Sequence, residues 1–190
     1  MKGAPGAGFF TSADGAVRFR MRDGSITVVL IEWKYTEKYN GDSLVIASSG
    51  TDRTSIYQAA FDDPSSPIDR ASVGEFANLF YEPFYQCMRQ QLLAHGMEKA
   101  REMEADRVMV LHLEPSINTD FHEITAPALR SRPESRAVDV WKGLLRTPDR
   151  FVSMSIEEFF SAALTAPSPA LREWSDYICE RYAWAAPQMG

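Results

Sequence analysis

The chain has 190 residues, of which 45% are hydrophobic and 12% aromatic, enough apolar material for one well-packed domain with appendages. Its formal net charge of -6 argues against a protein that coats nucleic acid, because such domains are usually basic. The acidic balance still permits an enzyme, which needs only a local basic surface.

No targeting or membrane-spanning segment is evident. The N-terminus lacks the apolar segment of a signal peptide, and no apolar run approaches the roughly 20 residues that cross a bilayer. The two cysteines, Cys87 and Cys179, show neither disulfide nor zinc spacing, and both are predicted to be buried free thiols. These features predict a cytoplasmic protein with no membrane partner.

Composition divides the chain into three parts. Residues 1–8, MKGAPGAG, are rich in glycine and are expected to be flexible. Residues 9–118 carry the strands and the long helix of a core, interrupted by a polar, turn-rich insertion at about 38–71. Residues 119–190 are expected to form a mainly helical extension packed on that core.

The first predicted element is a β-hairpin. Residues 16–21 and 26–35 are rich in β-branched and aromatic side chains, with a turn at Arg22-Asp23-Gly24. Glu32 and Lys34 lie two apart near the end of the second strand, so their side chains project from the same face. The hairpin brings Asp14 back to their level.

Two hairpin registers remain open. A two-residue loop would pair Arg22 with Ser25 and set Asp14 opposite Trp33, on the other face from Glu32. A three-residue loop with a left-handed glycine would pair Met21 with Ser25 and set Asp14 opposite Glu32. The first register packs the apolar side chains better, unless a β-bulge near residues 13–15 reconciles packing with convergence.

Convergence of Asp14, Glu32 and Lys34 would suit phosphodiester hydrolysis. Two nearby carboxylates repel each other unless a cation neutralises them, and Mg²⁺ prefers such oxygen ligands. A lysine beside them can orient the attacking water and stabilise charge on a phosphate. These residues therefore predict a metal-dependent nuclease.

Asp14 followed by Glu32-Trp33-Lys34 resembles the PD-(D/E)XK, or restriction-endonuclease-like, nuclease superfamily. The runs TSADGAVRF, VLIEWKYTE and YQCMRQQLLA are similar to bacterial proteins regarded as restriction endonucleases, and the resemblance covers about residues 9–118. It implies that Asp14, Glu32 and the main-chain carbonyl of Trp33 bind Mg²⁺, for which Mn²⁺ can substitute. It also implies that Lys34 is the catalytic lysine.

The resemblance implies an α/β fold: a mixed sheet in which an antiparallel hairpin is followed by a crossover helix and a parallel strand, with flanking helices and a helical C-terminal part. DNA is the expected substrate, and a homodimer would suit an enzyme that cuts two strands. Family members usually place a helix before the hairpin. Only residues 1–13 precede Asp14, and MKGAPGAGFF is too rich in glycine and proline, so that helix is expected to be absent.

Two helices are predicted after the insertion. Ser72-Val73-Gly74-Glu75 matches a capping box that opens a short helix, and a longer one is expected over about 83–104. Its apolar positions recur every three or four residues, as in a helix packed on a sheet. Gln86 and Gln90 form a polar patch on it. The resemblance implies that glutamines here support the active site, while an exposed amide face remains the alternative.

The next predicted strand, 108–113 or VMVLHL, is apolar throughout and suits the centre of the sheet, parallel to the strand before the helix. His112 on this strand is predicted to be a core histidine with a hydrogen-bonded partner. His122-Glu123 lacks the second histidine of a zinc-protease helix, so no metal is assigned to it.

The C-terminal part is predicted to contain a helix over 137–145, a strand over 151–154, a helix opened by a capping box at 155–158, and a last helix over about 169–184. A basic run lies between residues 130 and 150. It forms a candidate nucleic-acid surface, although such a run is more often simply a solvated face: Arg130, Arg132, Arg136 and Lys142.

Three functions stay open at this point. The first is a metal-dependent nuclease acting on DNA. The second is a catalytically inactive module of the same fold that binds nucleic acid or a protein partner, which the acidic balance and the absent helix favour. The third is an unrelated α/β domain in which Glu32 and Lys34 form an ordinary ion pair.

Overall fold

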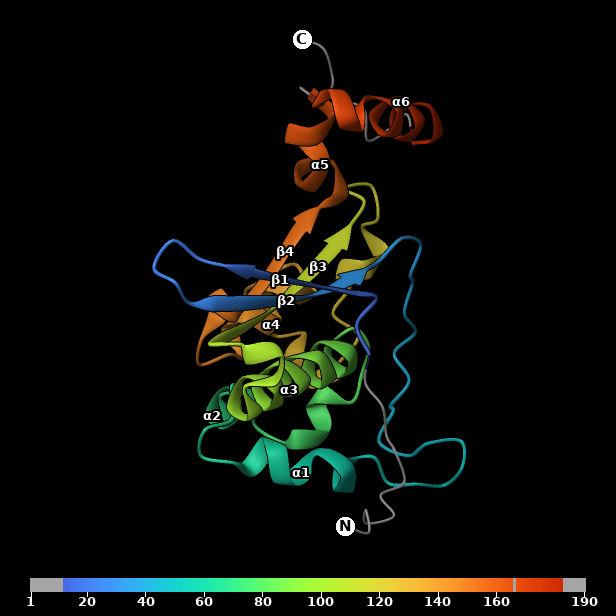
Figure 1. The fold of residues 1–190 in the computed structure, drawn as a ribbon. Helices are drawn as coiled ribbons and strands as arrows, with labels where there is room; N and C mark the ends of the chain where they lie inside the picture. The colour runs from blue at the N-terminus through green and yellow to red at the C-terminus, as the bar shows by residue number, and fades with distance from the viewer. Residues whose placement is uncertain (1–11, 166, 183–190) are drawn as a thin grey trace.

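The computed structural model describes residues 12–165 and 167–182. Its centre is a four-stranded mixed sheet in the order β1-β2-β3-β4 (Figure 1). β1 (Gly15–Arg20) is antiparallel to β2 (Ile26–Trp33), whereas β3 (Arg107–Glu114) runs parallel to both β2 and β4 (Phe151–Ser155). The predicted fold class, an antiparallel hairpin followed by parallel strands, is confirmed.

The hairpin adopts the register with the three-residue loop. Gly15 lies opposite Ile31, and the Met21 N–H donates to the Ser25 carbonyl at 2.8 Å. Gly24 has a φ of +88°, which favours glycine because it lacks a Cβ atom. One residue beyond the paired strands, this register sets Asp14 opposite Glu32.

This register places the apolar side chains of β1 on the less covered face of the sheet. Val17 and Phe19 are 48% and 41% exposed, and Met21 beyond the strand is 43% exposed. The other register would pack better only if these side chains were buried. They face away from the main core instead, so the prediction that the other register packs better was wrong.

Helices cover the opposite face of the sheet (Figure 1). α3 (Phe84–Ala100) packs Phe84 and Met88 into a core that includes Val28 and Val110 of the central strands. The same layer contains several shorter elements: α1 (Thr54–Asp62), α2 (Arg70–Val73), η1 (Phe76–Leu79) and α4 (Ala137–Gly143). Burial of these apolar side chains, at about 25 cal/mol per Å², is the main force that holds helices and sheet together.

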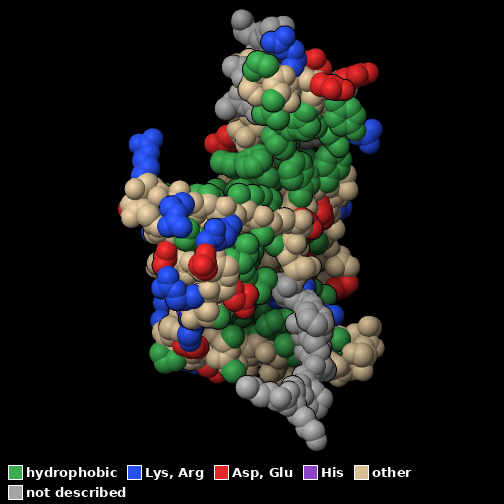
Figure 2. Space-filling view, viewed as in Figure 1, with side chains coloured by type: hydrophobic (Ala, Val, Ile, Leu, Met, Phe, Trp, Pro, Cys, Tyr) green, Lys and Arg blue, Asp and Glu red, His purple; other side chains and the backbone are tan. Residues whose placement is uncertain are grey.

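In the described part of the chain, α5 (Ile156–Thr165) and α6 (Arg172–Arg181) lie at one end of the less covered face (Figure 1). Leu111, Leu113 and Ile156 form a second small core there. The Trp33 ring lies 5.7 Å from that of Phe160 on α5. Figure 2 shows hydrophobic side chains gathered between the hairpin and these helices.

Two helix boundaries differ from the predictions. The predicted capping box does not open a helix, because α2 ends at Val73 and Gly74 follows with a φ of 71°. Asp69 caps α2 instead and accepts a hydrogen bond from the Ala71 N–H at 3.3 Å. α3 stops at Ala100 because Arg101 adopts the left-handed conformation, and η2 (Glu102–Glu104) is a separate turn.

Other local predictions are confirmed. Ser155 accepts a hydrogen bond from the Glu158 N–H at 3.0 Å and so caps α5 as expected. Cys87 and Cys179 are free thiols, although only Cys87 is buried.

The sequence did not predict α1, which lies within the supposed insertion. The expected flexible residues 1–8 and the expected end of the last helix near residue 184 lie outside the described residues.

The remaining elements are short 3-10 turns: η3 (Asp120–His122), η4 (Pro127–Leu129), η5 (Pro148–Arg150) and η6 (Pro169–Leu171). None of the helices in residues 12–165 and 167–182 is long and apolar enough to cross a lipid bilayer.

Candidate active site

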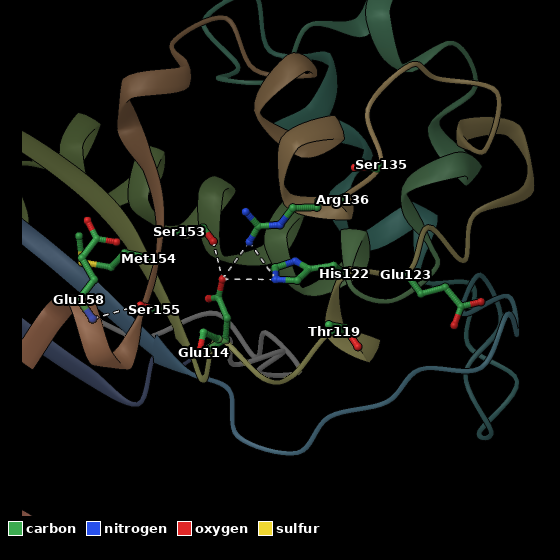
Figure 3. A pocket seen from close by; sticks show the side chains of 11 residues that line it. Glu114, Thr119, His122, Glu123, Ser135, Arg136, Ser153, Met154, Ser155 and Glu158 are labelled. Carbon is green, nitrogen blue, oxygen red and sulfur yellow. Dashed lines mark hydrogen bonds and ion pairs between the residues drawn. The ribbon is translucent and has the colours of Figure 1, made fainter. Parts of the chain in front are cut away.

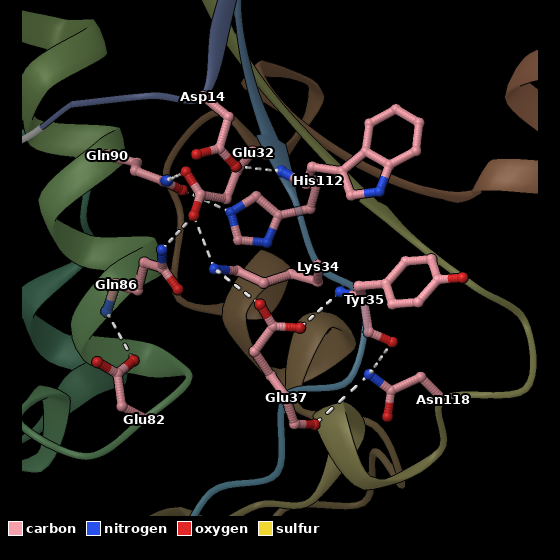
Figure 4. A network of polar contacts seen from close by, with 11 residues as sticks. Asp14, Glu32, Lys34, Tyr35, Glu37, Glu82, Gln86, Gln90, His112 and Asn118 are labelled. Carbon is pink, nitrogen blue, oxygen red and sulfur yellow. Dashed lines mark hydrogen bonds and ion pairs between the residues drawn. The ribbon is translucent and has the colours of Figure 1, made fainter.

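The site begins at the open end of the hairpin, where β1 and β2 meet. Asp14 is exposed, and its Oδ2 accepts a hydrogen bond from the Trp33 N–H at 2.8 Å. Glu32 lies on the facing strand, and side chains in directly opposite positions have Cβ atoms about 5 Å apart. Figure 4 shows the two carboxylates turned toward one another. The hairpin register therefore brings two acidic groups together.

Lys34 forms a buried ion pair with Glu32. Its Nζ lies 2.7 Å from Glu32 Oε1, and the two side chains are only 6% and 7% exposed. The Lys34 Nζ also lies 3.9 Å from an oxygen of Glu37. Buried charges are costly to remove from water unless they are paired and hydrogen-bonded, so this pair requires further polar partners.

Two glutamines of α3 provide those partners. The side-chain amide of Gln86 donates to Glu32 Oε1, and that of Gln90 donates to Glu32 Oε2. The two residues are one helical turn apart and therefore point in the same direction from α3. The Glu32 carboxylate is thus held by three donors, one from Lys34 and two from α3 (Figure 4).

His112 extends this network across the sheet to β3. It lies opposite Glu32 in the parallel pairing, is fully buried, and places its Nε2 at 2.5 Å from Gln90 Oε1. Burial and then the charge of Lys34 lower the pKa of His112 to about 3, so the ring is neutral. Because the Gln90 amide nitrogen donates to Glu32, its oxygen must accept from His112 Nε2–H. His112 thus fixes the orientation of Gln90.

The pair Asp14 and Glu32 fits a magnesium ion in the chemistry of its donors. Within the described residues, no three His, Cys, Asp or Glu side chains converge as a metal cage. Mg²⁺, however, is commonly bound by one or two carboxylates together with water and substrate phosphates. Two facing carboxylates and the nearby main-chain carbonyl of Trp33 are such a set.

A second polar cluster lies where β3 and β4 end, and the sequence reasoning missed it. Glu114, 2% exposed, accepts a hydrogen bond from Ser153 Oγ at 2.8 Å and lies 3.5 Å from the Arg136 guanidinium (Figure 3). Burial raises the pKa of Glu114 to about 7. His122, whose pKa is lowered to about 4 by burial and then by Arg136, lies 3.6 Å from the same carboxylate. His122 is neutral near pH 7, so this contact is not an ion pair.

These groups line a cavity of about 590 Å³ (Figure 3). Its walls also carry hydroxyl groups and two further carboxylates: Ser116, Thr119, Ser135, Ser155, Glu123 and Glu158.

The basic residues predicted to contact nucleic acid are engaged within the protein. Arg130 donates to the main-chain carbonyls of Ile124 and Thr125 at 3.1 and 3.3 Å. Arg132 donates to the Ser72 carbonyl. Arg136 belongs to the Glu114 cluster, and Lys142 is partly buried on α4.

Exposed arginines lie instead on the hairpin. Arg18 and Arg20 alternate with the apolar residues of β1 and therefore face the same side of the sheet as Asp14. Arg22 is exposed in the turn. Figure 2 shows Lys and Arg side chains over this side of the molecule. Arg18 forms an ion pair with Glu104, and Arg20 donates to the Gly24 carbonyl at 2.8 Å.

Comparison with known proteins identifies the family of the chain. No curated protein and no solved structure matches the chain significantly. A family model described as "Restriction Endonuclease associating with ARP" matches residues 4–183, nearly the whole chain. The chain therefore belongs to this restriction-endonuclease family and carries its nuclease-like domain.

Proposed function

We propose that the chain is a metal-dependent endonuclease that hydrolyses phosphodiester bonds in DNA. One observation carries the proposal: Asp14 faces Glu32 across the hairpin, and Lys34 contacts Glu32 at 2.7 Å. Membership of a restriction-endonuclease family supports the same chemistry. Mg²⁺ is the proposed cofactor, Mn²⁺ the proposed substitute, and a homodimer the proposed form for cutting two strands.

Each residue has a defined task in this proposal. Asp14, Glu32 and the Trp33 carbonyl hold the ion, and the chemistry that Mg²⁺ supplies when bound is polarisation of the phosphate and activation of water. The Lys34 ammonium stabilises the negative charge that develops on the phosphate under attack. Gln86 and Gln90 hold the Glu32 carboxylate in one orientation, which preorganises the site before substrate arrives.

DNA would approach from the exposed side of Asp14. Glu32 and Lys34 are each only 5% exposed, so the phosphate must enter where Asp14 opens to solvent. The hairpin arginines Arg20 and Arg22 lie near the turn, at the other end of the strands from Asp14, and are proposed to contact the backbone of DNA that extends along the hairpin. The predicted surface of Arg130, Arg132, Arg136 and Lys142 is less available for such contacts, because its three arginines bond within the protein.

Digestion of plasmid DNA with Mg²⁺ tests the enzyme. Lys34→Met should reduce cutting by about 100-fold or more, because it removes the charge beside the phosphate. Lys38→Met is the matched control, since the Lys38 side chain is 72% exposed and pairs with Asp120 on the surface. Circular dichroism verifies that Lys34→Met is folded. Equal cutting by wild type and a folded Lys34→Met would refute the role of Lys34.

Calorimetric titration with Mn²⁺ tests the metal site separately. Asp14→Asn should weaken binding, because the amide oxygen carries no full charge. Asp176→Asn changes an exposed aspartate on α6 in the same way and should leave the isotherm unchanged. An unchanged isotherm for Asp14→Asn would remove Asp14 from the proposed ligands.

A second candidate is an inactive nuclease-fold module that binds nucleic acid or a protein partner. The observation that favours it is the engagement of Glu32, whose buried carboxylate already accepts from three donors. An inactive module would bind DNA without cutting it at any Mg²⁺ or Mn²⁺ concentration. Digestion and a gel-shift assay on the same wild-type preparation separate the two candidates.

The family description also names an association with ARP. We propose that this chain associates with such a partner. Co-expression followed by size-exclusion chromatography tests this, since a stable pair would elute together and ahead of the 21.4 kDa chain alone. Separate elution at micromolar concentration would contradict a stable association.

A further inference from the structure

The Glu114 cavity lies on the same face and at the same edge of the sheet as the candidate active site. Glu32, His112 and Ser153 occupy aligned positions on β2, β3 and β4. Glu114 is two residues beyond His112 and therefore faces the same side. The Lys34 N–H donates to the Leu113 carbonyl at 2.7 Å, which places Lys34 beside Glu114, about one strand spacing or ~4.8 Å away.

Two buried polar atoms of this cavity have no partner within the described residues. They are Glu114 Oε2 and His122 Nδ1. The Arg136 guanidinium, which can only donate, contacts His122 Nε2 at 2.9 Å, so the neutral ring carries its proton on Nδ1. The residues around the cavity therefore carry one unsatisfied buried acceptor and one unsatisfied buried donor, and buried groups of this kind are rare without a ligand or water.

The pattern of unsatisfied groups discriminates between classes of ligand. A phosphate offers only acceptors and would meet the carboxylates of Glu114, Glu123 and Glu158. A guanidinium or ammonium offers only donors and would meet Arg136 while leaving His122 Nδ1–H unpaired. The edge of a nucleobase is neutral and presents donors and acceptors side by side. A volume of about 590 Å³ is ample for a base and its sugar.

We infer that the Glu114 cavity is a binding pocket for an unpaired nucleobase, next to the nucleotide whose phosphate is held at Lys34. Glu114 would accept from an N–H of the base, and His122 would donate to a ring nitrogen or carbonyl oxygen. Arg136 and Ser153 hold the Glu114 carboxylate in place. This inference rests on the proposed function, since it requires a nucleic acid at Lys34.

Fluorescence anisotropy in EDTA, where no strand is cut, tests the pocket on the full chain. The probes are a labelled oligothymidine of about 12 nucleotides and an abasic strand of the same length. Both carry the same phosphates, and only the first has bases. Wild type should bind the oligothymidine about 10- to 100-fold more tightly than the abasic strand.

Three variants locate the effect. Glu114→Gln should reduce this ratio toward one, whereas Glu123→Gln, a change of the same kind on the exposed rim, should preserve it. The wild-type ratio needs no variant, so the test survives a Glu114→Gln protein that fails to fold. Ser153→Ala, which loosens Glu114 without removing it, should lower the ratio by a smaller factor.

The outcomes separate this inference from the proposed function. Equal wild-type affinity for both strands overturns the base pocket, while plasmid cutting still decides whether the chain is a nuclease. A preserved ratio in a folded Glu114→Gln overturns the assignment to this cavity. Binding of an arginine-rich peptide that is lost in Glu114→Gln, with no preference for the base-carrying strand, would assign the cavity to a basic protein partner and overturn the inference.

Discussion

Glu114 should make the stability of the protein depend on pH in a way that a single substitution removes. Its pKa is raised from 4.5 to about 7 because the carboxyl is buried, and the folded protein therefore binds the proton more tightly than the unfolded chain. Stability from this group is fully present below pH 4.5 and is lost as the pH rises through 7. At about 1.4 kcal/mol per pKa unit, the loss is about 3 kcal/mol.

Urea denaturation of wild type and Glu114→Gln between pH 5 and pH 8 measures this loss. Glu114→Gln has no carboxyl to titrate, so its free energy of unfolding relative to wild type should rise by about 2.5 kcal/mol over this range. The lowered pKa values of His112 and His122 act in the opposite direction, because stability is lost as the pH falls below 6.5. Both histidines are present in the two proteins, and their effect largely cancels in the difference.

Glu123→Gln serves as the control, since it removes an exposed carboxyl from the same cavity and should change little. A difference between wild type and Glu114→Gln that stays constant from pH 5 to pH 8 would refute the reasoning. It would mean that Glu114 is ionised across the whole range and that water or a counter-charge reaches it.

Three further substitutions test the site and the hairpin. Lys34→Met leaves the Glu32 charge buried without its partner and should lower the free energy of unfolding by about 3–5 kcal/mol, against about 0.5 kcal/mol or less for Lys38→Met, both measured in urea. Gln90→Leu leaves Glu32 and His112 each short of a hydrogen bond and should cost about 1–3 kcal/mol, so a neutral result would contradict the network. Gly24→Ala puts a Cβ on a residue with a φ of +88° and should lower the melting temperature by the equivalent of about 1 kcal/mol, and an unchanged value would contradict the observed turn.

The sheet was predictable because its signals are local. The β-branched runs of the hairpin and the apolar run VMVLHL identify strands by themselves, and the crossover helix between them requires a parallel pairing. The hairpin register was not predictable. It depends on whether Val17 and Phe19 face a covered or an uncovered side of the sheet, and that is decided by helices far away in the sequence.

The candidate site was partly predictable for a similar reason. Glu32 and Lys34 are two residues apart, and Gln86 and Gln90 are four apart, so each pair shares a face by the geometry of its own element. The expectation that the glutamine pair meets the Glu32–Lys34 pair came only from the resemblance to the nuclease superfamily.

The Glu114 cluster had no such signal. Glu114, His122, Arg136 and Ser153 come from four separate segments, and no spacing connects them. The one sequence feature that indicated this cluster was a carboxylate, Glu114, at the end of a buried strand. His122 was set aside because it lacks a partner histidine, a criterion that detects zinc ligands and not hydrogen-bond donors.

The burial of the Glu32–Lys34 pair is consistent with the proposed chemistry and is not needed for stability. Replacing a buried ion pair by apolar side chains of similar size is often neutral or stabilising by about 1–4 kcal/mol. Glu32 and Lys34 continue a strand whose preceding residues, Val28 and Leu30 among them, already supply an apolar core on the same face. An apolar pair there would extend that core over α3. Gln86 and Gln90 would then lose the Glu32 carboxylate to which they donate. The proposed nuclease reaction, which needs a carboxylate and an ammonium held still beside Asp14, would account for a buried ion pair with this many hydrogen bonds.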